Sequence, residues 1–101
     1  MLNLDAFWKL RLMFPELTES QFQVLMLYAL GANSENIAEM LGRSVVAIKK
    51  TLQRIRQDLA IDKMETARLI YHSRIHTAMM APDDFPQKFY DTMSKKRSMI
   101  C

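Results

Sequence analysis

The sequence predicts an all-α fold. Residue types that favour helices dominate the chain of 101 residues, chiefly Leu, Met, Ala, Gln, Glu, Lys and Arg. Only two glycines and three prolines are present, which leaves little material for the many turns of an all-β fold. Half of the residues are hydrophobic, enough for one modest core, and the length suits one domain.

Two helices are expected before residue 32. Residues 4–14 form a short helix with apolar side chains on more than one face, and Pro15 stops it. Thr18 and Gln21 have the spacing of a capping box, which predicts that a second helix follows Thr18. Gly31 is expected to end that helix as a left-handed cap.

The next two helices have the proportions of a helix-turn-helix. Asn33 or Ser34 caps a short helix over residues 35–41, and a tight turn over residues 42–44 follows it. A longer helix over residues 45–59 begins after its cap, Ser44. In this helix the apolar residues recur at spacings of four, three and four, which predicts an inward stripe of Ile48, Leu52, Ile55 and Leu59.

The longer helix also carries the positive charge of the chain. The helix contains four cationic residues and one acidic residue, Asp58, so its net charge is 4 − 1 = +3. This equals the net charge of the whole sequence. A basic surface confined to one helix is the electrostatic footprint of a nucleic-acid binder. We expect its first turns to enter the major groove of double-stranded DNA. The candidate DNA-binding residues are Ser44, Val46, Lys49, Lys50, Gln53 and Arg54.

A further helix is expected over residues 63–79. Asp62 and Glu65 form a capping box before it, and Pro82 ends it. It has more apolar surface than one small core requires, so we expect a homodimer, at least on DNA. The candidate dimerisation residues are Leu69, Ile70 and Ser73.

Residues 82–101 leave two alternatives open. Phe85, Phe89 and Met93 are spaced by four, which favours a short docked helix. The polar composition and the basic run over residues 95–97 are equally compatible with a mobile tail.

Other classes of site lack support in the sequence. Cys101 is the single cysteine, so neither a disulfide within the chain nor a cysteine cluster for zinc is possible. His72 and His76 lie one helical turn apart without an evident third ligand, so no metal or other cofactor is expected. No nucleophile–base set or carboxylate pair stands out, which argues against an enzyme. No apolar run approaches the ~20 residues of a membrane span, and we expect a cytoplasmic protein.

The segment from Leu17 to Tyr71 contains the motif residues Leu17, Thr18, Val24, Leu25, Ala29, Gly31, Ile37, Ala38, Leu41, Ser44, Lys49, Ile55 and Leu59. In these residues it resembles the LuxR/GerE-type, or NarL-type, helix-turn-helix family. Sigma-factor region 4 domains share much of the middle part, whereas the helix after Ile61 favours LuxR/GerE. The resemblance implies a four-helix domain that contacts DNA through Lys49, Lys50 and Gln53, with dimerisation through the fourth helix.

The polar surface departs from the family pattern. Ser20 stands where the family has Arg, Glu35 where it has Lys, and Arg43 where it has an aliphatic residue. The apolar scaffold follows the pattern more closely than the polar surface does.

We therefore expect a stand-alone, sequence-specific transcription regulator. It has a helical extension over residues 1–16, the DNA-binding domain over 17–80 and an extension over 81–101; too few residues precede the motif for a receiver or ligand-sensing domain. The alternative is a protein-interaction module, an anti-activator or adaptor that binds another regulator or RNA polymerase. Glu35 and the apolar N-terminal helix favour this alternative, although that helix could instead complete the core.

Overall fold

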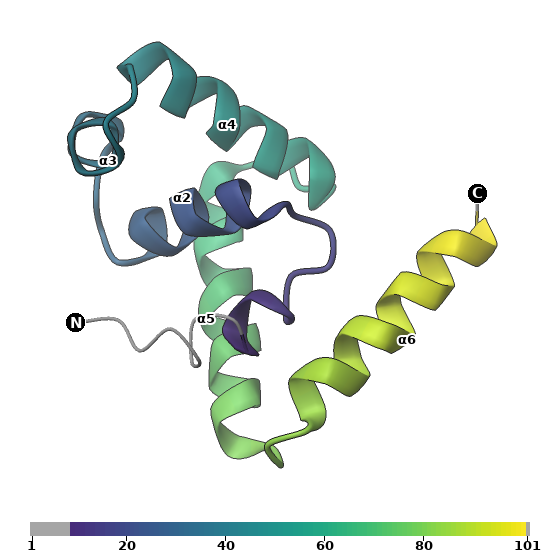
Figure 1. The fold of residues 1–101 in the computed structure, drawn as a ribbon. Helices are drawn as coiled ribbons and strands as arrows, with labels where there is room; N and C mark the ends of the chain where they lie inside the picture. Colours follow the sequence, from purple (N-terminus) through teal and green to yellow (C-terminus); the bar gives the residue numbers. More distant parts are fainter. Residues whose placement is uncertain (1–8, 101) are drawn as a thin grey trace. The chain divides into compact units, whose positions relative to one another are not determined.

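The computed structural model of the protein describes residues 9–100, and of residues 96–100 only the backbone. Over these residues the chain forms helices and turns without any strand, which confirms the all-α prediction. The helices are α2 (Glu19–Ala29), α3 (Ser34–Leu41), α4 (Val45–Asp58), α5 (Met64–Met80) and α6 (Phe85–Ile100) (Figure 1).

The chain divides into two compact units. One unit is Glu16–His72, and the other combines Met1–Pro15 with Ser73–Cys101, so that α5 contributes its first half to one unit and its second half to the other. The boundaries predicted after residues 16 and 80 stay a prediction. No helix in the described part of the chain is long and apolar enough to cross a membrane.

The unit Glu16–His72 is built around the mutually contacting helices α2, α3 and α4. The capping box at the start of α2 forms as predicted: Thr18 N donates to Gln21 Oε1 at 2.8 Å, and Gln21 N donates to Thr18 Oγ1 at 3.2 Å. Of the two candidate caps for α3, Asn33 is the one used. The core of this unit contains Leu17, Phe22, Val24, Leu25, Met26, Ala29, Ile37, Ala38, Ile48, Ile55, Ala67 and Tyr71.

Three helices of this unit end in the same way, with a residue at positive φ after the last turn. These residues are Gly31 (φ 105°), Gly42 (φ 65°) and Ala60 (φ 55°). In each case the next amide donates to a carbonyl five residues earlier, at 2.9–3.1 Å, as in a Schellman motif. Left-handed glycine was predicted at Gly31, whereas the left-handed alanine was not anticipated.

The N-terminal helix ends earlier than predicted. Residues 4–8 lie outside the described residues, and the helical part that follows covers only residues 9–11. The amides of Leu12, Met13 and Phe14 bond to carbonyls three residues earlier, so tight turns replace the helix. The expected end of the helix at Phe14 is therefore wrong. Phe14 precedes Pro15, and a residue before proline is sterically disfavoured in the α region.

The start of α5 is also displaced from the prediction. The helix begins at Met64, so Asp62 lies one position before the residue that could cap it. The predicted capping box of Asp62 with Glu65 is thus out of register with the helix. The backbone carbonyl of Asp62 instead accepts from Arg56 Nη1 at 3.5 Å.

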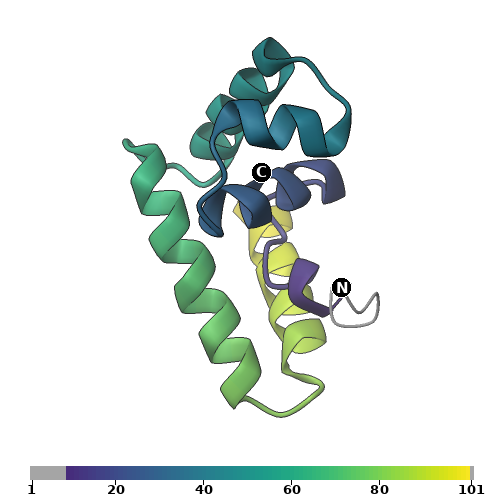
Figure 2. The ribbon, with the colours of Figure 1, turned by 90° about the vertical axis from the view of Figure 1, so that its left-hand side faces the viewer.

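In the second unit, α6 turns back from the end of α5 (Figures 1 and 2). It is a helix of 16 residues, so the alternative of a mobile tail over this stretch is wrong, and the helix is longer than expected. The Arg74 guanidinium lies over the rings of Phe14 (4.9 Å) and Phe89 (5.7 Å), and Arg74 Nη1 donates to Met13 O at 3.0 Å. This one side chain joins three segments of the unit.

Candidate nucleic-acid interface

The rotation of α4 is set by its buried residues. Ser44 caps the helix by accepting from Ala47 N at 3.1 Å, and Ile48 and Ile55, two turns apart, are fully buried. Leu52 and Leu59, the other members of the predicted inward stripe, are half-buried. Because the stripe faces the core, the opposite side of α4 faces solvent.

All six predicted DNA-binding residues are exposed: five lie on the solvent side of α4, and Ser44 is the cap before its first turn. Val46 is 63 % exposed although it is apolar, and the other five are exposed as well. No carboxylate of the described residues forms an ion pair with any of the three cations there. We call this surface the basic face; it consists of Ser44, Val46, Lys49, Lys50, Gln53 and Arg54.

Two polar residues of α4 lie outside the basic face. Thr51 Oγ1 donates to Ala47 O at 3.0 Å, so its hydroxyl is satisfied within the helix. Arg56 is half-buried and its guanidinium reaches the carbonyl of Asp62. Of the four cations that the sequence places in this helix, the structure therefore leaves three for an external partner.

The first half of α5 braces the far end of α2. Arg68 Nη2 donates to Tyr28 O at 3.3 Å, and its guanidinium lies 4.4 Å from the centre of the Tyr28 ring. His72 Nε2 lies 3.1 Å from Ala29 O. The last turn of α2 has no basic residue of its own, so α5 supplies the donors for its terminal carbonyls.

The outer side of α3 has the opposite charge from the basic face. Glu35 and Glu39 are exposed there, and Met40 beside them is 63 % exposed. A carboxylate repels the phosphates of DNA, so this side of the motif does not add to the basic face.

One exposed cation near α4 was absent from the predicted site. Arg43 lies in the turn directly before Ser44, and its Nη1 donates to Ser20 Oγ of α2 at 2.9 Å. The sequence marked Arg43 only as a departure from the LuxR/GerE pattern, because its hydrogen-bond partner stands 23 positions earlier in the chain.

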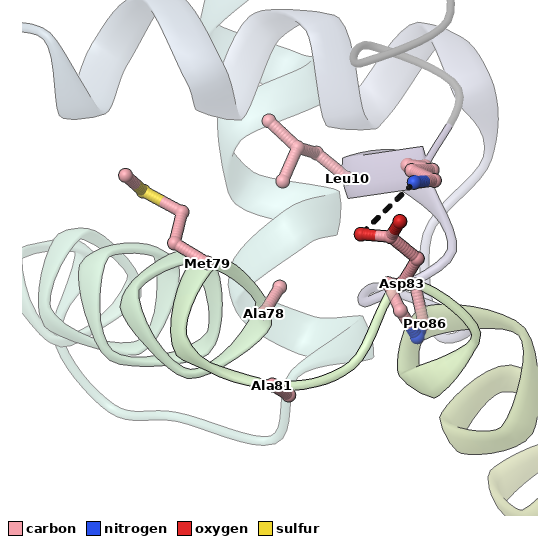
Figure 3. Close-up of a pocket in the computed structure, with 7 residues that line it drawn as sticks. Leu10, Ala78, Met79, Ala81, Asp83 and Pro86 are labelled. Carbon is pink, nitrogen blue, oxygen red and sulfur yellow. Dashed lines mark ion pairs between the residues drawn. The ribbon is translucent and has the colours of Figure 1, made fainter.

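A separate hollow lies within the second unit. It has a volume of about 370 Å³ and is lined mainly by apolar side chains, with Lys9 Nζ 3.7 Å from Asp83 Oδ1 at one side (Figure 3). Both charged side chains are largely exposed. Over the described residues no group of three or more His, Cys, Asp or Glu side chains is placed to hold a metal ion. Among the described residues that line the hollow, Lys9 and Asp83 carry the charged side chains.

One comparison with known proteins agrees with this helix-turn-helix geometry. The model of one family, described as Sigma-70, region 4, matches residues 7–59, or 53 of the 101 residues. The chain belongs to the Sigma-70 region 4 family. Such helix-turn-helix domains occur in sigma factors and in related DNA-binding regulators. Searches of curated proteins and of solved structures found no match.

The Sigma-70 region 4 match covers the basic face but not α5. It ends at Leu59, so it neither supports nor opposes the LuxR/GerE resemblance that depended on the following helix. On α5, Leu69 is 69 % exposed and Ser73, four residues later, is exposed too. Ile70 is half-buried, which leaves it less surface for a partner than the other two. Their role in dimerisation stays a prediction.

Proposed function

We propose that this member of the Sigma-70 region 4 family is a sequence-specific transcription regulator that inserts the basic face of α4 into the major groove of DNA. The observation that carries the proposal is that Lys49, Lys50 and Arg54 are exposed on one helix and lack ion-pair partners among the described residues. Cations in this position can neutralise phosphates, and the capped start of the helix can approach the groove.

Within the basic face, Gln53 is the residue we assign to base recognition. Phosphate contacts position a protein but carry no sequence information, whereas a glutamine amide can form two hydrogen bonds with the major-groove edge of adenine. Gln53 is exposed next to Arg54. The exposed Val46 is suited to contact a thymine methyl group.

We further propose the LuxR/GerE mode of action, with a DNA-binding domain over residues 17–80. In this mode the chain acts as a stand-alone cytoplasmic regulator, without catalysis, and two copies pair on DNA. The exposed Leu69 supports pairing through α5, with Ile70 and Ser73 next to it.

The proposal is tested by replacing two cations of the basic face. Lys49→Ala with Lys50→Ala should leave stability within ~0.5 kcal/mol of wild type, because both side chains are exposed. If each lysine contacts one phosphate, the slope of log K against log salt should fall by about 1.8. Fluorescence anisotropy with a duplex selected by the protein from a random library measures this slope. An unchanged affinity would exclude α4 as the reading helix.

Base recognition is tested with Gln53→Ala in the same assay. We expect a loss of about 1–3 kcal/mol of discrimination at one base position, while binding to a mixed-sequence duplex of equal length stays nearly the same. Lys63→Ala is a suitable control, because Lys63 is exposed and follows the C-terminal end of α4. Equal binding of all single-base variants by wild type and by Gln53→Ala would contradict the assignment.

The acidic side of α3 favours a second candidate, a module that binds another regulator or RNA polymerase. Glu35 and Glu39 would then pair with a basic protein surface around the exposed Met40. Glu35→Lys separates the two functions in a reporter assay. A DNA reader should keep regulation and bind DNA with a steeper salt dependence, whereas an interaction module should lose regulation through charge reversal.

A further inference from the structure

Arg43 and Ser20 form a polar pair beside the start of α4. Arg43 is exposed in the turn between α3 and α4, and Ser20 is half-buried in the first turn of α2. Arg43 Nη1 donates to Ser20 Oγ at 2.9 Å, and no carboxylate of the described residues forms an ion pair with Arg43. The guanidinium is therefore held in one place while its charge is left without a counter-ion.

A role in holding the fold together does not account for this arrangement. The guanidinium has five N–H donors, of which one reaches a neutral hydroxyl. A hydrogen bond that water can reach adds little stability, because water replaces it when it breaks. The remaining donors form no hydrogen bond with the described residues, and a planar fork suits a phosphate.

The electrostatics of the neighbouring helix end are favourable for such a partner. Arg43 directly precedes Ser44, the cap of α4, and the first turn of α4 contains no acidic residue. Ser44 Oγ satisfies the amide of Ala47, whereas the first amides of a helix have no acceptor within the helix. An anion beside Arg43 would therefore also meet the positive end of the α4 dipole.

We propose that Arg43 binds a phosphate of the DNA backbone beside the first turn of α4, and that Ser20 is a positioning residue that orients its guanidinium. This inference rests on the proposed function, since it adds a contact to the same interface. The phosphate contact fixes how deeply and at which register the basic face enters the groove, without reading a base itself.

The test measures salt dependence of binding with the full chain and two labelled duplexes, one selected by the protein and one of mixed sequence. Arg43→Ala should lower the salt slope of log K by about 0.9, which corresponds to roughly fivefold weaker binding at about 0.15 M salt. The loss should be the same factor for both duplexes, because a phosphate contact is independent of sequence. Arg43→Gln is a second variant that keeps a polar side chain in the turn.

Ser20→Ala separates positioning from charge. It keeps the guanidinium, so the salt slope should stay at the wild-type value while the affinity for both duplexes falls by a smaller factor than in Arg43→Ala. Lys63→Ala controls for the general loss of one charge, because Lys63 follows the C-terminal end of α4, a helix of 14 residues and therefore about 20 Å long.

The possible outcomes distinguish this inference from the proposed function. If Lys49→Ala lowers the slope and both Arg43 variants leave it unchanged, the Arg43 contact is refuted and DNA reading by α4 stands. A slope that falls equally in Lys63→Ala also refutes it, because the effect is then not local. If the wild-type chain binds neither duplex, both the proposed function and the Arg43 contact are refuted.

Discussion

Two neighbouring residues of α4, Ile48 and Lys49, should respond in opposite ways to alanine. Ile48 is 0 % exposed, and Ile48→Ala removes three carbon atoms from the core. At ~0.8 kcal/mol for each buried carbon the transfer contribution is about 2.4 kcal/mol, and the cavity left behind adds to it. The better helix propensity of alanine offsets less than ~0.7 kcal/mol. The net loss is therefore about 2–4 kcal/mol.

A loss of this size is a large part of the ~5–15 kcal/mol that stabilises a domain. The chain should still fold, with its Tm lowered by roughly 10–25 °C. Lys49→Ala changes an exposed side chain and should shift stability by less than ~0.5 kcal/mol. The assay is urea denaturation followed by far-ultraviolet circular dichroism, in which the midpoint should fall for Ile48→Ala at an unchanged m-value.

DNA binding gives the complementary result. Lys49→Ala should weaken binding while the protein stays folded, whereas Ile48→Ala should bind normally at temperatures where it is still folded. A stability loss below ~1 kcal/mol for Ile48→Ala, or above it for Lys49→Ala, would refute the rotation of α4 and with it the position of the basic face.

Three further predictions follow from single side chains. Leu69→Glu should abolish cooperative binding to a two-half-site operator, because pairing through α5 would remove the new carboxylate from water at a large cost in free energy. Sedimentation that shows a wild-type monomer on DNA would contradict this prediction. Ala60→Gly should raise stability by up to ~1 kcal/mol, because glycine relieves the positive φ; a lower Tm would oppose this. Burial raises the pKa of Tyr71 above its ordinary 10.0. As pH rises past 10, the phenol ionises in the unfolded chain before it ionises in the folded protein, so the free energy of unfolding falls. The urea midpoint of Tyr71→Phe should therefore fall less with pH than the midpoint of the wild type. Parallel plots of midpoint against pH for the two proteins would exclude the effect.

The helix boundaries of the central unit follow from local signals. The capping box of Thr18 with Gln21 and the cap of Ser44 satisfy amides only a few residues away, so the sequence contains both partners. The inward stripe of α4 is similarly local, because residues spaced by three and four share a helix face. These signals were sufficient to predict that the six residues of the basic face are exposed.

The ends of the chain were predicted less well, because their conformation depends on distant partners. The polar residues after Pro82 have no strong preference, and a marginal helix there gains its stability from packing. The ring of Phe89 provides this packing by lying beneath Arg74, 15 positions earlier in the chain. Near the N-terminus, the helical residues likewise end at residue 11, shortly before the buried Met13 and Phe14.

The sequence by itself therefore determined the helical class, the helix-turn-helix and which face of α4 is charged, because each depends on spacing within one helix or turn. Tertiary structure decided which cations are left for a partner. Arg56 turns toward the carbonyl of Asp62, while Arg43 is oriented by a hydroxyl on another helix, although both are equally basic in the sequence. The physical reason is that spacing along a helix sets the direction of a side chain, whereas its partners are set by the segments that packing brings beside it.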